Sequence, residues 1–256
     1  MRILLAIILV VTLTACATAN SSKGNVPSLR LEVLATLPHD RGSFTEGLEI
    51  SGETLYESTG LEDRSFVHAG PVGRPPTIST DSLPSPMFGE GITVLGPTMW
   101  QLTWKDGIAI ERDTATLAEL RRVRYEGEGW GLCHEQGRLV MSNGTDRLTF
   151  RDPASFAELG EVTVHSVNKT YSQLNELECV DGNVYANVWQ TDYILRIDPA
   201  TGVVTGLIDA SGLLTAEQQQ GADVLNGIAA IPGTDEFLIT GKLWPVTFRA
   251  RFLPAS

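Results

Sequence analysis

The sequence predicts an all-β fold, a five-bladed β-propeller, and three observations support this prediction. Short runs rich in Val, Ile, Tyr, Trp and Thr are separated by turn pairs such as D-G, S-G, N-G and D-P. Long amphipathic helical patterns are hard to find in the same chain. The third observation is an internal repeat of 40 to 51 residues, close to the length of one four-stranded propeller blade.

The repeat occurs in five copies. Each copy begins with a polar or aromatic residue, then a small or acidic residue, then an aliphatic residue, a turn and a second apolar strand. The copies begin at Glu46, Glu90, Trp130, Asn175 and Asn226, with spacings of 44, 40, 45 and 51 residues. Runs such as TDRLTFRDPASF and TDYILRIDPATGVV supply further strands, so each unit is a meander. A β-sandwich or barrel does not explain a repeat of this length.

The register inside the repeat is constant. The second strand follows the aliphatic position by eight residues in the first four copies (48 to 56, 92 to 100, 132 to 140 and 177 to 185). In the fifth copy the distance is ten residues (228 to 238), because Pro232-Gly233-Thr234-Asp235 lengthens the hairpin loop. Five equivalent hairpins therefore account for nearly the whole chain after residue 28.

The N-terminus predicts export. Arg2 precedes an apolar run from Ile3 to Leu13, which is too short for a permanent membrane helix and is typical of a signal peptide. The ending LTAC resembles a bacterial lipobox, so we expect a signal peptide over residues 1–15 and a lipid on Cys16. An ordinary secretory signal cut near Ala15-Cys16-Ala17 is the alternative. Residues 16–27 are expected to form a flexible tether, and residues 28–256 a single propeller domain.

Charge and location follow from the same features. The chain has 31 acidic and 19 basic residues, a formal charge of −12, which would repel phosphate backbones and argues against nucleic-acid binding. We expect a periplasmic, membrane-anchored monomer. Ala17 stands where an aspartate would favour retention in the inner membrane, which makes the outer membrane the preferred location.

The remaining cysteines and the histidines show no metal-ligand spacing. Cys133 and Cys179 lie in apolar strand patterns and are expected to be two buried thiols, although an oxidising compartment leaves a disulfide open. No pair of histidines has i, i+4 or H-E-x-x-H spacing, so we expect neither a metal nor another cofactor. The four are interpreted as surface or loop residues: His39, His68, His134 and His165.

Equivalent positions of a propeller lie on a ring around its axis. The first ring consists of the five residues that begin the repeats. A second ring, expected near the same end of the channel, consists of Gly60, Trp104, Gly144, Trp189 and Lys242. The two rings bring carboxylates, amides, an ammonium group and three tryptophans to one mouth, which is the composition of a pocket for a small polar ligand.

The two carboxylates of these rings differ in context. Glu90 follows Phe88, and Glu46 follows Phe44, so both should lose hydration and have raised pKa values. We expect Glu90 to exchange protons with the substrate, and Glu46 to share that role or to receive the positive charge of an amine. Lys242 is expected to hold one carboxylate ionised or to stabilise a developing oxyanion.

The motifs resemble those of plant-type and bacterial glutaminyl-peptide cyclotransferases. The resemblance covers nearly all of the chain after the tether, through FTEGLEI, FGEGITVLG, MWQLTWKDG, GEGWGLC, LNELECVDGNVYANVWQTD, LNGIA and TGKLWP. It implies a metal-independent five-bladed propeller that converts N-terminal glutamine of peptides to pyroglutamate, with Glu90 as the acid and base. The cavity residues implied by the motifs are Phe44, Glu46, Phe88, Glu90, Trp104, Trp130, Trp189 and Lys242; Asn175 and Asn226 are added from the first ring.

The chain departs from the family pattern at two places. The first signature usually reads FTQG, whereas this chain has Glu46, so a second carboxylate enters the cavity and should shift the pKa of Glu90. The segment from Leu61 to Leu83 lacks the usual serine-and-arginine strand, and the first blade is expected to be irregular there.

Two other functions stay open from sequence. A calcium-dependent, lactonase-like hydrolase would use the oxygen atoms of Glu46, Asn175 and Asn226 as ligands, although tryptophans would crowd such a site. A non-catalytic envelope propeller that binds peptide ends is the second alternative, since a fold alone does not determine function.

Overall fold

The computed structural model describes residues 26–80 and 82–255, and the regular elements in these residues are β-strands. The prediction of an all-β fold is confirmed. The expected signal peptide and Cys16 lie outside the described residues. Within the described part, no helix is long and apolar enough to cross a membrane.

Three sheets are built from consecutive strands, each paired antiparallel with the next. The first contains β2 (Thr45–Ser51), β3 (Thr54–Thr59), β4 (Val67–Pro71) and β5 (Ile78–Ser79). The second contains β6 (Gly89–Leu95), β7 (Thr98–Thr103), β8 (Ile108–Asp113) and β9 (Glu119–Arg124), and the third contains β10 (Leu132–Glu135), β11 (Arg138–Met141), β12 (Arg147–Arg151) and β13 (Glu158–Thr163).

The remaining eight strands form one sheet in the order β14-β15-β16-β17-β1-β20-β19-β18. They are β1 (Ser28–Pro38), β14 (Leu174–Val180), β15 (Asn183–Val188), β16 (Tyr193–Ile197), β17 (Val204–Asp209), β18 (Leu225–Ala230), β19 (Glu236–Gly241) and β20 (Val246–Pro254). The N-terminal strand β1 joins the two halves, since it pairs along its length with β20 and, through residues 28–30, in parallel with β17. The last sheet is thus completed by the first strand of the chain.

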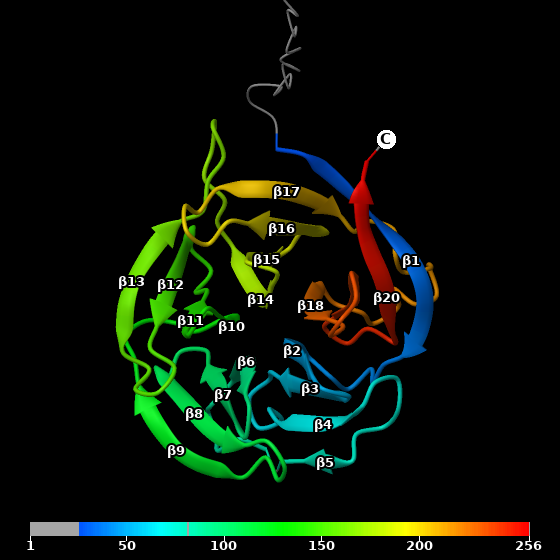
Figure 1. Ribbon diagram of the computed structural model, residues 1–256. Coiled ribbons are helices and arrows are strands. Elements are labelled where there is room, and N and C mark those ends of the chain that lie inside the picture. The colour runs from blue at the N-terminus through cyan, green and yellow to red at the C-terminus, as the bar shows by residue number, and fades with distance from the viewer. Residues whose placement is uncertain (1–25, 81, 256) are drawn as a thin grey trace, which may run out of the picture.

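The sheets surround a central axis, with the first strand of each repeat innermost (Figure 1). Strands β2, β6, β10, β14 and β18 contact one another in a closed ring. The expected hairpin register is confirmed in all five copies by the equivalent cross-strand pairs Glu49↔Tyr56, Thr93↔Trp100, Cys133↔Val140, Glu178↔Tyr185 and Ala229↔Leu238. Equivalent residues of the repeats therefore lie around one axis.

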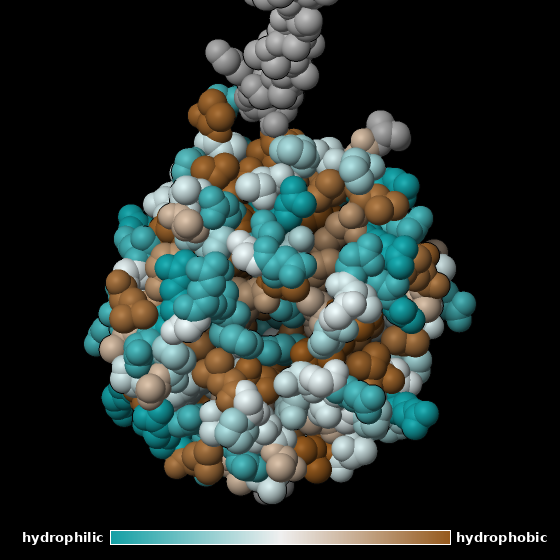
Figure 2. Space-filling model, viewed as in Figure 1, coloured by the Kyte–Doolittle hydropathy of each residue, from teal (hydrophilic) through white to brown (hydrophobic). Residues whose placement is uncertain are grey.

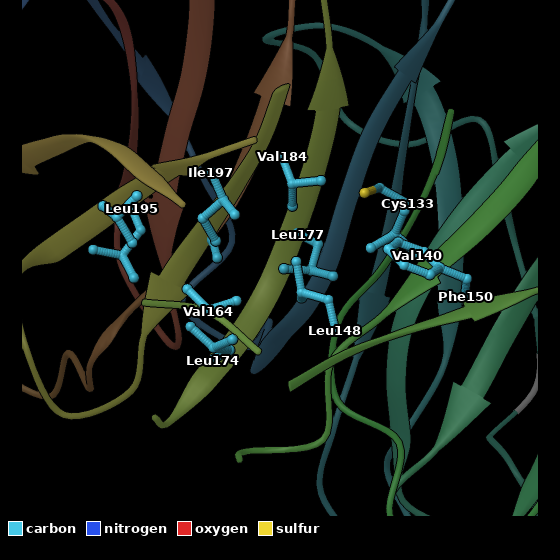
Figure 3. Packing of buried hydrophobic residues seen from close by; sticks show 12 residues of the cluster. Cys133, Val140, Leu148, Phe150, Val164, Leu174, Leu177, Val184, Leu195 and Ile197 are labelled. Carbon is cyan, nitrogen blue, oxygen red and sulfur yellow. The ribbon is translucent and has the colours of Figure 1, made fainter. Parts of the chain in front are cut away.

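Apolar side chains of neighbouring sheets pack against each other. Figure 3 shows one such cluster between the sheet of β10 to β13 and the strands that follow it, where Val140, Leu148, Leu177 and Leu195 are all buried. The outer surface mixes hydrophilic and hydrophobic residues (Figure 2). Each sheet therefore packs against the sheet on either side of it, and only its outer edge is exposed. The burial of apolar side chains between adjacent sheets stabilises the ring.

The expected irregularity of the first repeat is confirmed. Strand β5 has two residues, and the connection from β3 to β4 contains Leu61 and Asp63 with positive φ angles of 84° and 62°. Only the pairs His68↔Ser79 and Ala69↔Ile78 join β4 and β5. The segment with Pro75 and Pro76, which cannot donate backbone hydrogen bonds, explains why the outer strand is this short.

The expectation of two free buried thiols is wrong. Cys133 in β10 and Cys179 in β14 form a disulfide, with their Cα atoms 5.4 Å apart. The ring arrangement of the repeats brings them together, because Cys133 lies three residues after Trp130 and Cys179 four residues after Asn175, in neighbouring inner strands. The bond cross-links two inner strands over a separation of 46 residues.

We predict that replacing both cysteines with alanine lowers the free energy of unfolding by about 2–4 kcal/mol, because the cross-link restricts the unfolded chain. Urea denaturation of the wild type and of Cys133→Ala/Cys179→Ala measures this difference. The wild type in reducing buffer should approach the double variant. An unfolding midpoint that is the same with and without reductant would show that the thiols are not paired.

Candidate active site

A cavity of about 370 Å³ lies where the inner strands begin. Nine of the residues proposed from sequence line it: Phe44, Glu46, Phe88, Glu90, Trp104, Trp130, Asn175, Trp189 and Lys242. Asn226 is buried behind Glu46 and does not line the cavity. Gln190, Asp223 and Val224 line it without having been singled out in the sequence.

β-bulges place the polar residues of the first ring. Pairing shifts register at the beginning of β2, β6, β14 and β18, and each shift spans the residue that begins the repeat: Glu46, Glu90, Asn175 and Asn226. A bulge inserts an extra residue into the strand and changes the direction of its side chain. The same local irregularity therefore turns four polar side chains toward the axis.

A buried ion pair occupies one side of the cavity. Lys242 Nζ donates a hydrogen bond of 2.6 Å to Glu46 Oε1, and both side chains are buried. Asn226 Nδ2 donates to Glu46 Oε2 at 3.2 Å and to the carbonyl of Thr45 at 2.9 Å. Burial raises the pKa of Glu46 to about 7, against the opposing effect of the Lys242 ammonium. Asn226 thus positions the ion pair from behind.

Glu90 differs from Glu46 in having a free oxygen. Its side chain is 5% exposed, and Oε2 has no hydrogen-bond partner among the described residues. Burial and the nearby charge of Glu46 hold the pKa of Glu90 well above its usual range, and Lys242 only partly offsets them. The Oδ1 atom of Asn175, another buried cavity acceptor, is also without a partner in the described chain.

Aromatic rings form the walls. Phe88 contacts Phe44 and Trp104 edge to face, with ring centroids 6.1 and 5.6 Å away, and Trp130 contacts Trp189 in the same way at 5.6 Å. Such packing excludes water and favours a ligand with an apolar stem.

The tryptophan N–H groups do not all face the ligand space. Trp104 Nε1 and Trp130 Nε1 both donate to Glu128 Oε2, at 2.8 and 3.0 Å. Glu128 therefore fixes two walls of the cavity at once, and these two indoles are not available to an oxyanion. Glu128 lies two residues before Trp130, outside both rings, and the repeat pattern carried no signal for it.

Two members of the predicted second ring are glycines for a steric reason. A Cβ atom at Gly144, where φ is 77°, would lie 2.6 Å from the Trp130 ring, and one at Gly60 would overlap the Phe88 ring. Glycine at these two positions leaves space that the Phe88 and Trp130 side chains occupy.

Further buried carboxylates connect the inner strands below the cavity. Glu176 accepts the N–H groups of Leu48 and Ile228, at 3.3 and 2.8 Å, and so bridges β2 and β18. Glu49 and Glu178 each accept one backbone N–H from the neighbouring inner strand, at 3.0 Å. Among the described residues, no group of His, Cys, Asp or Glu side chains has the arrangement of a metal site.

One histidine was misjudged from sequence. His39 is not a surface residue, since its side chain is 7% exposed and its Nε2 lies 3.0 Å from the buried Glu57. His68 contacts the other oxygen of Glu57 at 2.7 Å. The Thr45 hydroxyl also donates to Glu57, so this cluster supports the strand that carries Glu46.

The fold and the cavity together define an enzyme-like pocket for a small polar group at the centre of an all-β ring. The profile of the family described as Glutamine cyclotransferase matches residues 6–252. Glutaminyl-peptide cyclotransferase of Arabidopsis thaliana is 35% identical over 231 residues, covering 88% of this chain and 72% of the relative. The crystal structure of Myxococcus xanthus glutaminyl cyclase has a TM-score of 0.82 and 36% identity, covering 91% of this chain and 100% of that one. The chain therefore belongs to the glutamine cyclotransferase family, an enzyme of the glutaminyl cyclase type, which confirms the family predicted from the motifs.

We predict that the protein is more stable at pH 5 than at pH 8. Burial raises the pKa of Glu49 to about 8 and holds the pKa of Glu178 well above its usual range. A carboxyl with a raised pKa retains its proton in the folded state after the unfolded chain has lost it, so stability falls as pH rises from about 4.5 toward 8. Thermal denaturation across this range measures the slope.

The variant Glu49→Gln should flatten this pH dependence, because glutamine keeps an acceptor for Val94 N–H without titrating. Glu53→Gln, in the exposed β2–β3 turn, is the matched control and should retain the wild-type slope. An unchanged slope in Glu49→Gln would contradict the assignment.

Proposed function

We propose that this chain converts the N-terminal glutamine of peptides and proteins to pyroglutamate with release of ammonia, as a monomeric five-bladed propeller. In this interpretation the eight-stranded sheet is two blades, β14 to β17 and β18 to β20 completed by β1, joined through the contact of β1 with β17. The closed ring of five inner strands supports that count.

The observation that carries the proposal is a pair of buried acceptors without partners, Glu90 Oε2 and Asn175 Oδ1, inside an aromatic cavity. Buried acceptors normally have a hydrogen-bond donor. An N-terminal glutamine brings two kinds of N–H donor, its α-amino group and its side-chain amide, on a short apolar stem that suits the aromatic walls. The cavity thus matches the substrate in polarity as well as in shape.

Glu90 is the acid and base of the proposed reaction. The α-amino group, whose ordinary pKa is about 7.7–8.0, reacts as the neutral amine. Its nitrogen bonds to the side-chain amide carbon while the Glu90 carboxylate takes one of its two protons, which gives a tetrahedral intermediate with a neutral ring nitrogen. Glu90 returns the proton to the amide nitrogen, the carbon–nitrogen bond breaks, and ammonia leaves with pyroglutamate formed.

Lys242 and the cavity walls support this sequence. The ammonium of Lys242 has three donors, one of which binds Glu46, so positive charge is available to the oxyanion while Trp104 and Trp130 are held by Glu128. Curling the glutamine against the aromatic walls supplies the orientation that an intramolecular attack requires. Glu46, already paired, keeps Lys242 in place rather than exchanging the proton.

The two alternatives fit the geometry less well. A calcium ion between Glu46, Asn175 and Asn226 would have to displace the Lys242 ammonium and the amide of Asn226 from the Glu46 carboxylate. A pure binding module would not require a carboxyl with a free oxygen and a raised pKa. Both alternatives make different predictions for the Glu90 variant below.

We further propose export and lipid anchoring. The LTAC motif at residues 13–16 supports a signal peptide over residues 1–15 and a lipid on Cys16 of a periplasmic protein, preferably in the outer membrane. Strand β1 begins at Ser28, and its other end at Pro38 leads through residues 39–43 to Phe44 of the cavity. A tether over residues 16–27 would then leave the cavity mouth facing away from the membrane. Cys16→Ala should move the protein from the membrane to the soluble fraction of the cell envelope.

We predict that Glu90→Gln lowers kcat for a glutamine-initiated dipeptide by about 10²- to 10⁴-fold, because no group then takes and returns the proton. Ammonia release measures turnover, and excess chelator should leave the wild type unaffected. Quenching of the pocket tryptophan fluorescence by the dipeptide should persist in the variant. Retained turnover in Glu90→Gln, or loss of wild-type turnover with chelator, would overturn the proposed mechanism.

We predict that Glu46→Gln retains turnover but shifts the acid limb of the kcat/KM profile to lower pH. Removing the negative charge of Glu46, and leaving the Lys242 ammonium uncompensated, lowers the pKa of Glu90. The exposed Glu53→Gln variant serves as the charge-matched control. An acid limb at the wild-type position would show that Glu46 does not influence the proton-transfer group.

A further inference from the structure

We propose that the enzyme prefers substrates whose second residue is lysine or arginine, which binds in an acidic hollow beside the catalytic cavity. This inference rests on the proposed function, since it concerns the residue that follows the reacting glutamine. The hollow has a volume of about 150 Å³ and is lined by residues that include Asp192, Leu213, Leu214, Asp223 and Val224. We call it the second-residue hollow.

The hollow adjoins the cavity. Asp223 and Val224 line both spaces, so a peptide that leaves the cavity over these two residues reaches the hollow. Asp223 N donates to the carbonyl of Lys242 at 2.8 Å, and Lys242 N donates to the carbonyl of Val224 at 3.0 Å. The rim is thus bonded through its backbone to the lysine of the reaction site.

The backbone of Asp223 is held from below as well. The buried Trp244 donates its indole N–H to the carbonyl of Asp223 at 2.8 Å. The Asp223 carboxylate is exposed and accepts a hydrogen bond only from the adjacent N–H of Val224, at 2.6 Å, within the described structure. The backbone of Asp223 is thus fixed by hydrogen bonds, while its carboxylate remains able to bind a cationic group of a ligand.

The hollow is lined by two leucines and two aspartates. Leu213 and Leu214 are half-buried and pack on the core cluster of the last sheet. Asp192 is exposed on the other side, and in the described chain neither it nor Asp223 forms an ion pair. Arg41, which contacts the same segment, donates to the carbonyl of Gln220 instead. No protein cation therefore competes through an ion pair with the two carboxylates.

This combination selects the chemistry of the ligand. Lysine and arginine have aliphatic stems that cover apolar surface and charged ends that reach the rim. An acidic second residue would meet two carboxylates of like charge, and alanine would leave the leucines uncovered. The hollow is formed by the connection between β17 and β18, residues 210–224, which accounts for the longest repeat spacing of 51 residues.

The test compares kcat/KM for three amidated dipeptides, Gln-Lys, Gln-Ala and Gln-Glu. We expect the wild type to favour Gln-Lys over Gln-Glu by about five- to tenfold at low ionic strength, with the ratio falling toward one at about 0.5 M salt. Asp223→Asn and Asp192→Asn should each lower the ratio, and the double variant should bring it close to one. The kcat/KM of each variant for Gln-Ala is measured beside the ratio, so that a general loss of activity is distinguished from a loss of charge preference.

The control is Asp181→Asn. Asp181 is exposed in the turn after β14, at the end of the strand opposite Asn175, so it removes the same charge from the far side of the molecule. Asparagine also tolerates its φ of 51°. This variant should keep the wild-type ratio.

The outcomes separate the two levels of inference. A ratio that is the same in the wild type and the double variant, or that falls equally in Asp181→Asn, overturns the second-residue hollow. Turnover of Gln-Ala without any charge preference overturns it as well, while leaving the cyclase activity in place. No turnover of Gln-Ala by the folded wild type overturns the proposed function together with the hollow.

Discussion

The structure depends on the convergence of five inner strands on one axis. Each strand brings its first residues to the same end of the ring, and the ring closes because β1, the first strand of the chain, completes the last sheet. Because neighbouring inner strands pack closely, many of their polar groups are buried away from water. Bulges at four of the five strand beginnings then turn polar side chains toward the axis. The cavity is therefore a consequence of how the ring closes.

Burying ionisable groups near the axis has a large desolvation cost, and two kinds of interaction offset it. Glu46 is compensated by the Lys242 ammonium and the Asn226 amide, whereas Glu176 and Glu178 are compensated by backbone N–H groups of the next strand. Glu90 alone among these carboxyls lines the cavity with an oxygen that has no partner in the described residues. A buried carboxyl oxygen without a partner in such a cavity is suited to binding an N–H donor of a ligand.

The acidic residues around the cavity have different tasks. Glu128 links the indoles of Trp104 and Trp130 through a single oxygen, which fixes two walls and removes two N–H donors from the reaction space. Asp223 lies at the rim, bonded through its backbone to Lys242 but free in its side chain. The acidic residues that give the chain its net charge of −12 therefore have different roles. Glu128 supports the walls of the cavity, whereas the Asp223 carboxylate faces the space that a peptide substrate would cross.

The sequence by itself determined the all-β class, the repeat, the hairpin register and nine residues of the cavity. Seven of the nine occupy equivalent positions of the repeat, which a closed ring places together whatever the details of packing, and Phe44 and Phe88 were indicated by the family motifs. Only the tertiary structure decided which partners those residues take. The pairing of Lys242 with Glu46, the position of Asn226 behind the cavity, the anchoring of two indoles by Glu128 and the Cys133–Cys179 disulfide all join different repeats or connecting segments. Such contacts depend on the relative rotation and separation of neighbouring sheets, which the linear pattern does not encode, and the rim residues Gln190 and Asp223 lie in connections that the repeat does not constrain.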